Sequence, residues 1–323
     1  MTNATTLRTD DAPRTPAGSP ASPSERDVLA ALAAGPHRRL DVGHSKLAYW
    51  RFGRGPDVVF VHGWPLHAAT FRRIVPALAR DFTCHLIDLP FVGRTESKPG
   101  APVGLREHAD TVRAAVDALG LTRYAFVAHD SGGVFTRLVA ADDARVVGQV
   151  LGNTEIPGHV PPMLKVYAIA ARLPGGSSLL RSSMHLGPMR RSVLGFGGCF
   201  TDPWSVEGEF GDLFVRPMLT SPAVMAGQSK LLNHLDFRVV GRLPEVHART
   251  RSPALLVWGA DDPWFPLAKA RAMLPQFGGG AEIREIAGGK LFAHEDHPEA
   301  FVAHARPFLL DCFASASGPK AVA

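Results

Sequence analysis

The chain has 323 residues, of which 46% are hydrophobic, enough for one large core with an appended piece. Its formal net charge of +5 comes mainly from scattered arginines, without basic blocks interleaved with aromatic residues, which disfavours a nucleic-acid-binding protein. No apolar run reaches the roughly 18 residues that a membrane-spanning helix needs, so no membrane partner is expected.

The cysteines and the two chain ends indicate the compartment. Cys84, Cys199 and Cys312 are odd in number and lack paired spacing, which argues against a disulfide framework or a zinc site. Residues 1–24 hold no apolar run typical of a secretory signal and are expected to be a disordered tail, with a second loose tail at 314–323. We therefore expect a cytoplasmic protein, monomeric or homodimeric, that acts on a small molecule.

Strands and helices alternate along most of the chain. A short helix at 25–34 and extended segments at 38–42 and 46–52 lead into a buried β-branched run at 57–61. Further strands are expected at 83–88, 124–128, 146–154, 253–258 and 281–286, and helices at 68–80, 105–119, 266–277 and 298–313. This alternation predicts an α/β fold with a mostly parallel central sheet, helices on both faces, and a ligand site at the carboxyl ends of the strands.

The alternation stops between residues 157 and 246. This stretch is rich in proline and glycine and shows only short helical pieces, such as 163–173 and 225–235. We interpret it as a helical cap inserted between two parts of one core, residues 25–156 and 247–313.

The strand at 124–128 runs into a polar turn, Ala128-His129-Asp130-Ser131-Gly132, that is typical of a nucleophile elbow. In such a turn the residues two before and two after the reactive one must be small, because strand and helix approach closely. Ala128 and Gly132 meet this condition if Asp130 is the reactive residue. If Ser131 were the reactive residue, His129 would take one of the two small positions and its imidazole would collide with the neighbouring backbone. The sequence therefore predicts a carboxylate nucleophile, although an ordinary turn with an N-cap aspartate gives a similar pattern.

A carboxylate nucleophile narrows the chemistry. It attacks an sp³ carbon with a leaving group, or a strained epoxide carbon, and forms an alkyl ester that water then cleaves. The helix that begins at Ser131 is expected to keep Asp130 ionised and to supply the Ser131 backbone N–H to the oxyanion.

Four motifs in this order resemble the α/β-hydrolase superfamily, in particular its haloalkane dehalogenase and epoxide hydrolase branch, over about residues 40–313. They are His62-Gly63-Trp64-Pro65, Asp88-Leu89-Pro90-Phe91-Val92-Gly93-Arg94, the elbow itself, and Gly259-Ala260-Asp261-Asp262. The resemblance implies an α/β-hydrolase fold and neither a cofactor nor a metal.

The resemblance also implies roles for single residues. Trp64, which follows the His62-Gly63 pair, would give the second oxyanion donor through its backbone and face the substrate with its indole. Asp262 would orient a general-base histidine. Some dehalogenases place this acid after the preceding strand, where Glu155 stands here, so Glu155 remains an alternative.

The chain departs from the family at the base. In this branch the histidine belongs to a His-aromatic-x-x-Glu-(Asp/Glu)-x-Pro pattern, and counting back from Pro298 places Leu291 at its position. Leucine cannot accept a proton. Another imidazole could replace it, with His294 nearest in sequence; the further candidates lie in the cap, at His159, His185 and His234.

The sequence also lacks the complete set of residues that these families use to stabilise the leaving group. Dehalogenases of this branch often have a tryptophan after the nucleophile, where Ser131 stands, and epoxide hydrolases use two cap tyrosines, where this chain has only Tyr167. We expect a hydrolase that acts on an epoxide or alkyl halide through an alkyl-enzyme ester. The alternatives are a lyase or cyclase that uses Asp130 as a proton shuttle, or a catalytically silent binding relative.

Overall fold

The computed structural model describes residues 22–316, and most of the two tails expected at 1–24 and 314–323 lies outside these residues. A central sheet of nine strands dominates the described part, in the order β1-β2-β4-β3-β6-β7-β8-β9 with β5 beside β2. The strands are β1 (Arg38–Asp41), β2 (Ser45–Phe52), β3 (Asp57–Val61), β4 (Thr83–Ile87), β5 (Glu96–Ser97), β6 (Tyr124–Ala128), β7 (Val146–Gly152), β8 (Ala254–Gly259) and β9 (Ala281–Ile286).

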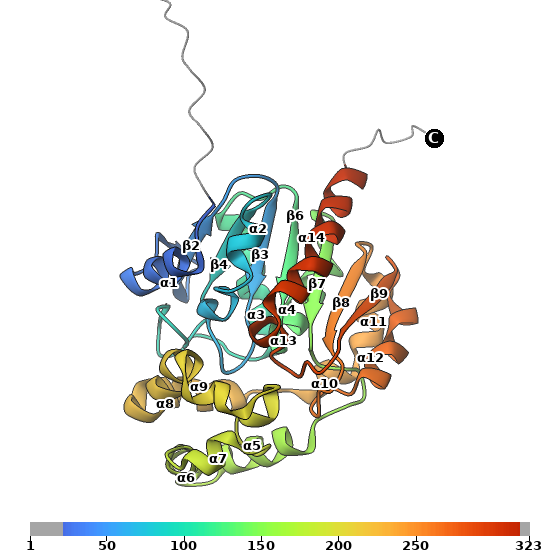
Figure 1. The fold of residues 1–323 in the computed structure, drawn as a ribbon. Helices are drawn as coiled ribbons and strands as arrows, with labels where there is room; N and C mark the ends of the chain where they lie inside the picture. The colour runs from blue at the N-terminus through green and yellow to red at the C-terminus, as the bar shows by residue number, and fades with distance from the viewer. Residues whose placement is uncertain (1–21, 317–323) are drawn as a thin grey trace, which may run out of the picture.

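The antiparallel pairs are β1–β2, β2–β5 and β2–β4, and the remaining pairs, from β4–β3 across the sheet to β8–β9, are parallel. Figure 1 shows α2 and α14 in front of the sheet and α3 and α4 behind it. The helices around the sheet are α1 (Glu25–Ala34), α2 (Val75–Leu78), α3 (Leu105–Ala118), α4 (Ser131–Ala140), α11 (Leu243–Arg249), α12 (Leu267–Met273), α13 (Ala293–Asp296) and α14 (Pro298–Ser315). The expected α/β architecture with helices on both faces is confirmed, because buried strands such as β3, β4 and β6 are covered on both sides.

Seven α-helices of the described part lie between β7 and β8, the last of them being α11. We call the first six the inserted helices; they occupy the lower part of Figure 1, beyond the carboxyl ends of the parallel strands. They are α5 (Pro162–Arg172), α6 (Gly176–Met184), α7 (Gly187–Arg191), α8 (Arg216–Thr220), α9 (Pro222–Asn233) and α10 (Phe237–Gly241).

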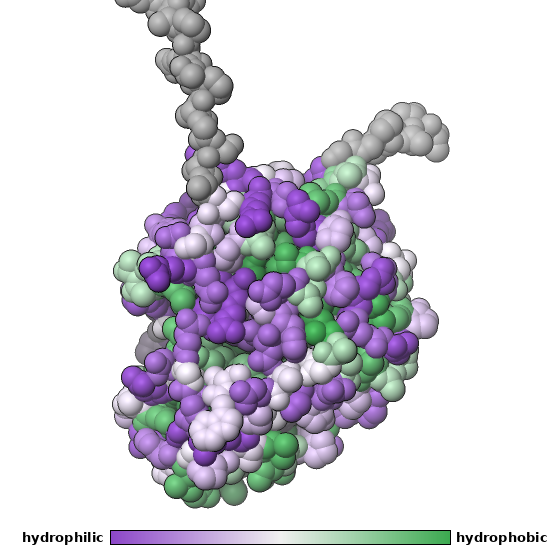
Figure 2. Space-filling model, viewed as in Figure 1, coloured by the Kyte–Doolittle hydropathy of each residue, from purple (hydrophilic) through white to green (hydrophobic). Residues whose placement is uncertain are grey.

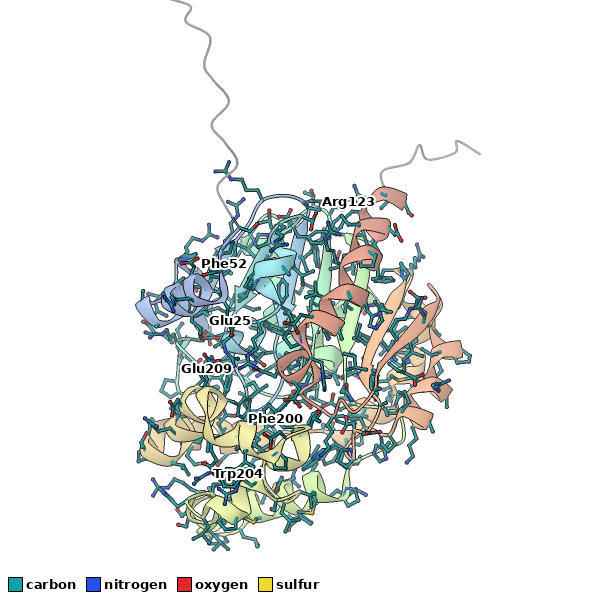
Figure 3. The ribbon with its side chains drawn as sticks, in the orientation of Figure 1. Glu25, Phe52, Arg123, Phe200, Trp204 and Glu209 are labelled. Atoms are coloured by element: carbon teal, nitrogen blue, oxygen red, sulfur yellow. The ribbon has the colours of Figure 1, made fainter. Side chains whose placement is uncertain are left out.

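Aromatic packing and ion pairs join the core to the chain between β7 and β8, which we call the inserted segment. Phe200, labelled in Figure 3, packs edge-on against Phe210 and against Phe292 of the loop after β9. The buried Arg72 guanidinium pairs with Glu295 of the core at 2.8 Å and also with Glu209 of the inserted segment. These contacts fix how the inserted helices sit over the sheet.

The outer side of the inserted helices is unusually apolar. Of the large hydrophobic side chains that are exposed in the described part, all but Leu310 fall between residues 166 and 204. In Figure 2 green apolar side chains gather at the lower end of the molecule, while polar ones cover much of the face above. No helix of the described part is both long and apolar enough to cross a bilayer.

Some element boundaries differ from the sequence prediction. The helix expected at 68–80 is a 3₁₀ turn, Ala68–Phe71, followed by the short α2. Pro76 lacks the N–H that would bond to the carbonyl of residue 72, so the helix is interrupted there. The helix expected at 266–277 ends early for the same reason at Pro275, and α14 continues to Ser315, into the stretch expected to be loose.

Candidate active site

Asp130 occupies the turn between β6 and α4, at the carboxyl edge of the parallel strands. Its backbone has φ 50° and ψ −137°, a conformation that non-glycine residues rarely adopt and that is typical of functional sites. Glycines make the turn possible: a Cβ on Gly63 would lie 2.5 Å from Asp130 Oδ2, and one on Gly132 would collide with the Val61 carbonyl. The strand and the His62-Gly63 loop thus hold the carboxylate in one place.

The protonation of Asp130 reflects opposing influences. Burial, with the nearby carboxylate of Glu155 adding to it, raises the pKa of Asp130 well above its usual range, although the backbone N–H groups of Ser131 and Trp64 act in the other direction. Burial therefore opposes the ionisation of Asp130 that the sequence led us to expect from the start of α4.

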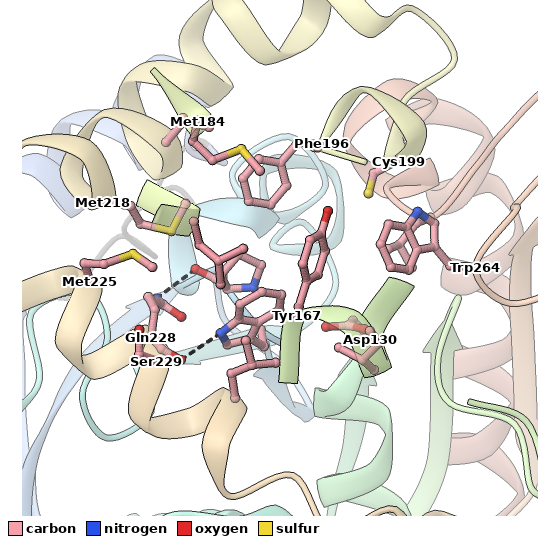
Figure 4. A pocket seen from close by; sticks show the side chains of 18 of the residues that line it. Asp130, Tyr167, Met184, Phe196, Cys199, Met218, Met225, Gln228, Ser229 and Trp264 are labelled. Atoms are coloured by element: carbon pink, nitrogen blue, oxygen red, sulfur yellow. Dashed lines mark hydrogen bonds between the residues drawn. The ribbon is translucent and has the colours of Figure 1, made fainter. Parts of the chain in front are cut away.

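Asp130 lines a cavity of about 110 Å³ between the sheet and the inserted helices (Figure 4). Most of the lining is apolar or aromatic, with Leu164, Met184, Phe196, Met218, Leu232 and Phe292 among its side chains. An enclosed apolar site with a few polar groups is the usual form of a small-molecule site.

Trp64 and Ser131 lie beside Asp130 and are partly engaged with each other. The Trp64 backbone N–H donates to Ser131 Oγ at 3.0 Å, so this donor is shared between the hydroxyl and the Asp130 carboxylate. The Trp64 indole lines the cavity, and its Nε1–H donates to the Gln228 carbonyl at 3.2 Å. That bond ties the loop to α9 and leaves this N–H unavailable to a leaving group.

His62 supports the loop from behind. Its Nε2 accepts the Leu89 backbone N–H at 3.0 Å, so the proton sits on Nδ1, which donates to the Gly63 carbonyl at 3.1 Å. Burial lowers the pKa of His62 to about 4, which keeps the ring neutral. His62 lies outside the lining of the main cavity and positions the loop at residues 62–65.

Leu291 lines the cavity together with Asp130, at the position that the family pattern assigns to the base. No histidine of the described chain lines this cavity or hydrogen-bonds to Asp130. His294 lies behind it, fully buried, with Nε2 at 2.7 Å from Thr70 Oγ1 and its ring 4.3 Å from that of His129. His159 bonds to the Trp264 carbonyl at 2.8 Å, and neither His185 nor His234 contributes to the cavity wall.

Asp262 is buried on the loop after β8. Asn153 Nδ2 donates to its Oδ2 at 2.7 Å, and the Trp264 backbone N–H donates to its Oδ1 at 2.8 Å. Burial raises the pKa of Asp262 to about 7 despite these bonds. Its charge also contributes to the raised pKa of Asp130, which places the two carboxylates near each other.

Glu155 is held differently. Thr154 Oγ1 donates to its carboxylate at 3.0 Å, and the buried Arg137 guanidinium lowers its pKa, although burial has the larger, opposite effect. Arg137 also donates to the Glu155 carbonyl at 2.9 Å. Glu155 thus belongs to a buried network beneath the elbow and does not line the cavity.

Tyr167 is the aromatic hydroxyl on the cavity wall. It comes from α5, lies 6.3 Å from the Trp264 ring, and has no hydrogen-bond partner for its buried hydroxyl. Burial raises its pKa to about 12, so the phenol stays protonated and can donate. Figure 4 shows Tyr167 projecting between Phe196 and Trp264.

Three groups near the site were not predicted from the sequence. Asn153 could have been suspected, because it is a polar residue directly after a buried strand. Gln228 and Cys199 line the cavity from the inserted segment, where no pattern in the sequence indicates which side chains face inward. No cluster of three or more metal-binding side chains occurs in residues 22–316.

A family model described as the alpha/beta hydrolase family matches residues 58–304, most of the chain. The chain belongs to this family. Haloalkane dehalogenase 2 of Mycobacterium tuberculosis is 26% identical over 272 residues, which cover 82% of this chain and 92% of that protein. A soluble epoxide hydrolase of Corynebacterium sp. is 32% identical over 124 residues, 38% of this chain and 43% of the relative.

Solved structures of family members have the same fold. A loop variant of a haloalkane dehalogenase from Bradyrhizobium elkanii superposes with a TM-score of 0.71 at 21% identity, over 87% of this chain and 98% of the other. The family model confirms the α/β-hydrolase assignment, and the similarity to these relatives indicates a hydrolase.

Proposed function

We propose that the protein reacts with a small organic epoxide, which Asp130 opens to give an aspartyl ester. The observation that supports this best is the position of Asp130: a strained elbow presents its carboxylate to an enclosed apolar cavity, beside two backbone N–H groups. Asp130 Oδ attacks a ring carbon, the C–O bond of the ring breaks, and the oxygen takes a proton.

Tyr167 supplies that proton in the proposed reaction. Its hydroxyl lies on the cavity wall, stays protonated, and has no other partner. An alkyl halide needs a donor for the departing halide, and the Trp64 indole N–H is already bonded to Gln228. Within the substrate classes of the relatives, this favours an epoxide over a halide.

Hydrolysis of the ester is the step for which the cavity lacks a base. Leu291 lies where an imidazole would activate water, and a positioned base typically accelerates such a step by ~10²–10⁴-fold. We therefore expect the ester to form faster than it is cleaved, so that it accumulates.

The raised pKa of Asp130 supports a second candidate function. A carboxyl that stays protonated in an apolar cavity can act as an acid, as a lyase or cyclase would require. Intact-mass measurement after incubation with terminal epoxides distinguishes the two. A stoichiometric adduct that Asp130→Asn abolishes supports the ester, whereas conversion without an adduct favours the acid.

A further inference from the structure

The wall that α9 contributes to the cavity carries polar atoms without partners. Gln228 and Ser229 are 3% and 7% exposed, and both line the cavity between the apolar side chains of Met225 and Leu232. Neither Gln228 Oε1 nor Ser229 Oγ has a hydrogen-bond partner. A buried polar atom left unpaired weakens the folded state, so such atoms call for an explanation.

The orientation of the Gln228 amide is fixed by its surroundings. Its Nε2 donates to the Pro65 carbonyl at 3.0 Å, as Figure 4 shows, and its own backbone carbonyl accepts the Trp64 indole N–H. A flipped amide would place two carbonyl oxygens against each other at Pro65. Oε1 is therefore an acceptor held in one direction and in need of a donor.

Ser229 complements this acceptor. Its hydroxyl follows Gln228 on the same helix and can either donate or accept. Oε1 accepts, and the Ser229 hydroxyl can donate or accept, so the O–H group of a bound alcohol can pair with either of them. A carboxylate would face the lone pairs of Oε1, and an ammonium would lack a counter-charge on this wall.

We propose that Gln228 and Ser229 form a subsite for a hydroxyl group, so that the molecule bound beside Asp130 is apolar apart from one alcohol. The subsite rests on the proposed function only in one respect: the proposed function says which group of the bound molecule reacts with Asp130. The cavity of about 110 Å³ is somewhat smaller than the roughly 150 Å³ cavity that accepts benzene, which limits the bound part to about that size.

Phenol and toluene test the subsite, because they have the same number of heavy atoms and differ in one hydroxyl. Calorimetry gives the ratio of their dissociation constants for the wild-type chain, Gln228→Met and Ser229→Ala. We expect the preference for phenol over toluene to fall about tenfold in Gln228→Met and severalfold in Ser229→Ala, while toluene affinity changes little. Toluene affinity thus controls for an intact cavity.

An unchanged ratio in Ser229→Ala and Gln228→Met, or no binding of phenol to the wild type, overturns the subsite. If Gln228→Met also loses toluene, the cavity has collapsed and Ser229→Ala alone decides. The binding measurement needs no reaction at Asp130. If the variants lose the preference for phenol but the wild type forms no epoxide adduct, the subsite stands and the proposed function is rejected. If the adduct forms but the variants keep the preference, only the subsite is rejected.

Discussion

His129 Nε2 donates to the backbone carbonyl of Leu291 at 2.9 Å, which fastens the loop after β9 to the residue that precedes Asp130. This bond holds residue 291 on the cavity wall whatever side chain it carries, because only its backbone takes part. Asp262 remains in place nearby, held by Asn153. In the proposed function, residue 291 would thus keep the position of the base while presenting an isobutyl group.

The proton donor is tested by Tyr167→Phe. Opening an epoxide needs a proton for the ring oxygen, so adduct formation with a terminal epoxide should fall by ~10²-fold or more. Toluene binding involves no proton transfer, should change little, and serves as the control. A loss of toluene affinity as large as the loss of adduct formation would assign Tyr167 to packing instead.

The close approach at Gly63 is tested by Gly63→Ala. The added Cβ would lie 2.5 Å from Asp130 Oδ2 and 2.7 Å from the Ser131 nitrogen, so the carboxylate must move. Displacements of this size cost on the order of 10²-fold in rate. The matched control is Gly100→Ala, because a Cβ there meets no atom within 4 Å; adduct formation is followed by mass in both variants.

Ser131→Ala should ease the ionisation of Asp130. In the wild type the Trp64 N–H is shared with Ser131 Oγ, and removing the hydroxyl gives this donor wholly to the carboxylate. The pKa of Asp130 should fall, so the rise of adduct formation with pH should begin at lower pH. Ser131→Thr keeps the hydroxyl and should keep the wild-type profile. Identical profiles for Ser131→Ala and the wild type would show that the donor is not shared.

Asp262 should contribute a loss of stability as the pH rises from about 4 to 7. The pKa of Asp262 is raised from 3.8 to about 7 in the folded chain, so ionisation favours the unfolded state over this range, by up to about 4 kcal/mol. Urea unfolding at several pH values measures this slope. Asp262→Asn should flatten it, although the variant loses the Asn153 bond at every pH. A slope that the substitution leaves unchanged would locate the titrating group elsewhere.

Local sterics and counting produced the site predictions. The need for small residues around the elbow selected Asp130 over Ser131, and the distance to Pro298 singled out Leu291. Both residues line the cavity, and their chemical roles stay predictions. Strand and helix alternation predicted the sheet, because burial on both faces leaves a continuous apolar run in each strand.

Contacts between distant segments could not be predicted. Asn153 meets Asp262 across 109 positions, and Trp64 meets Gln228 across 164. The opposing effects on the pKa of Asp130 could not be predicted either, because the helix start is evident in the sequence, whereas the depth of burial and the nearby Glu155 are not.

The most direct test compares the Asp130 peptide of the wild type and of Leu291→His after incubation with a terminal epoxide. The account predicts that the wild-type peptide gains the mass of the epoxide and keeps it. It predicts that Leu291→His releases diol and retains little adduct, with ester cleavage ~10²–10⁴-fold faster. A wild-type Asp130 peptide that stays unmodified, or an adduct that persists equally in Leu291→His, would contradict it.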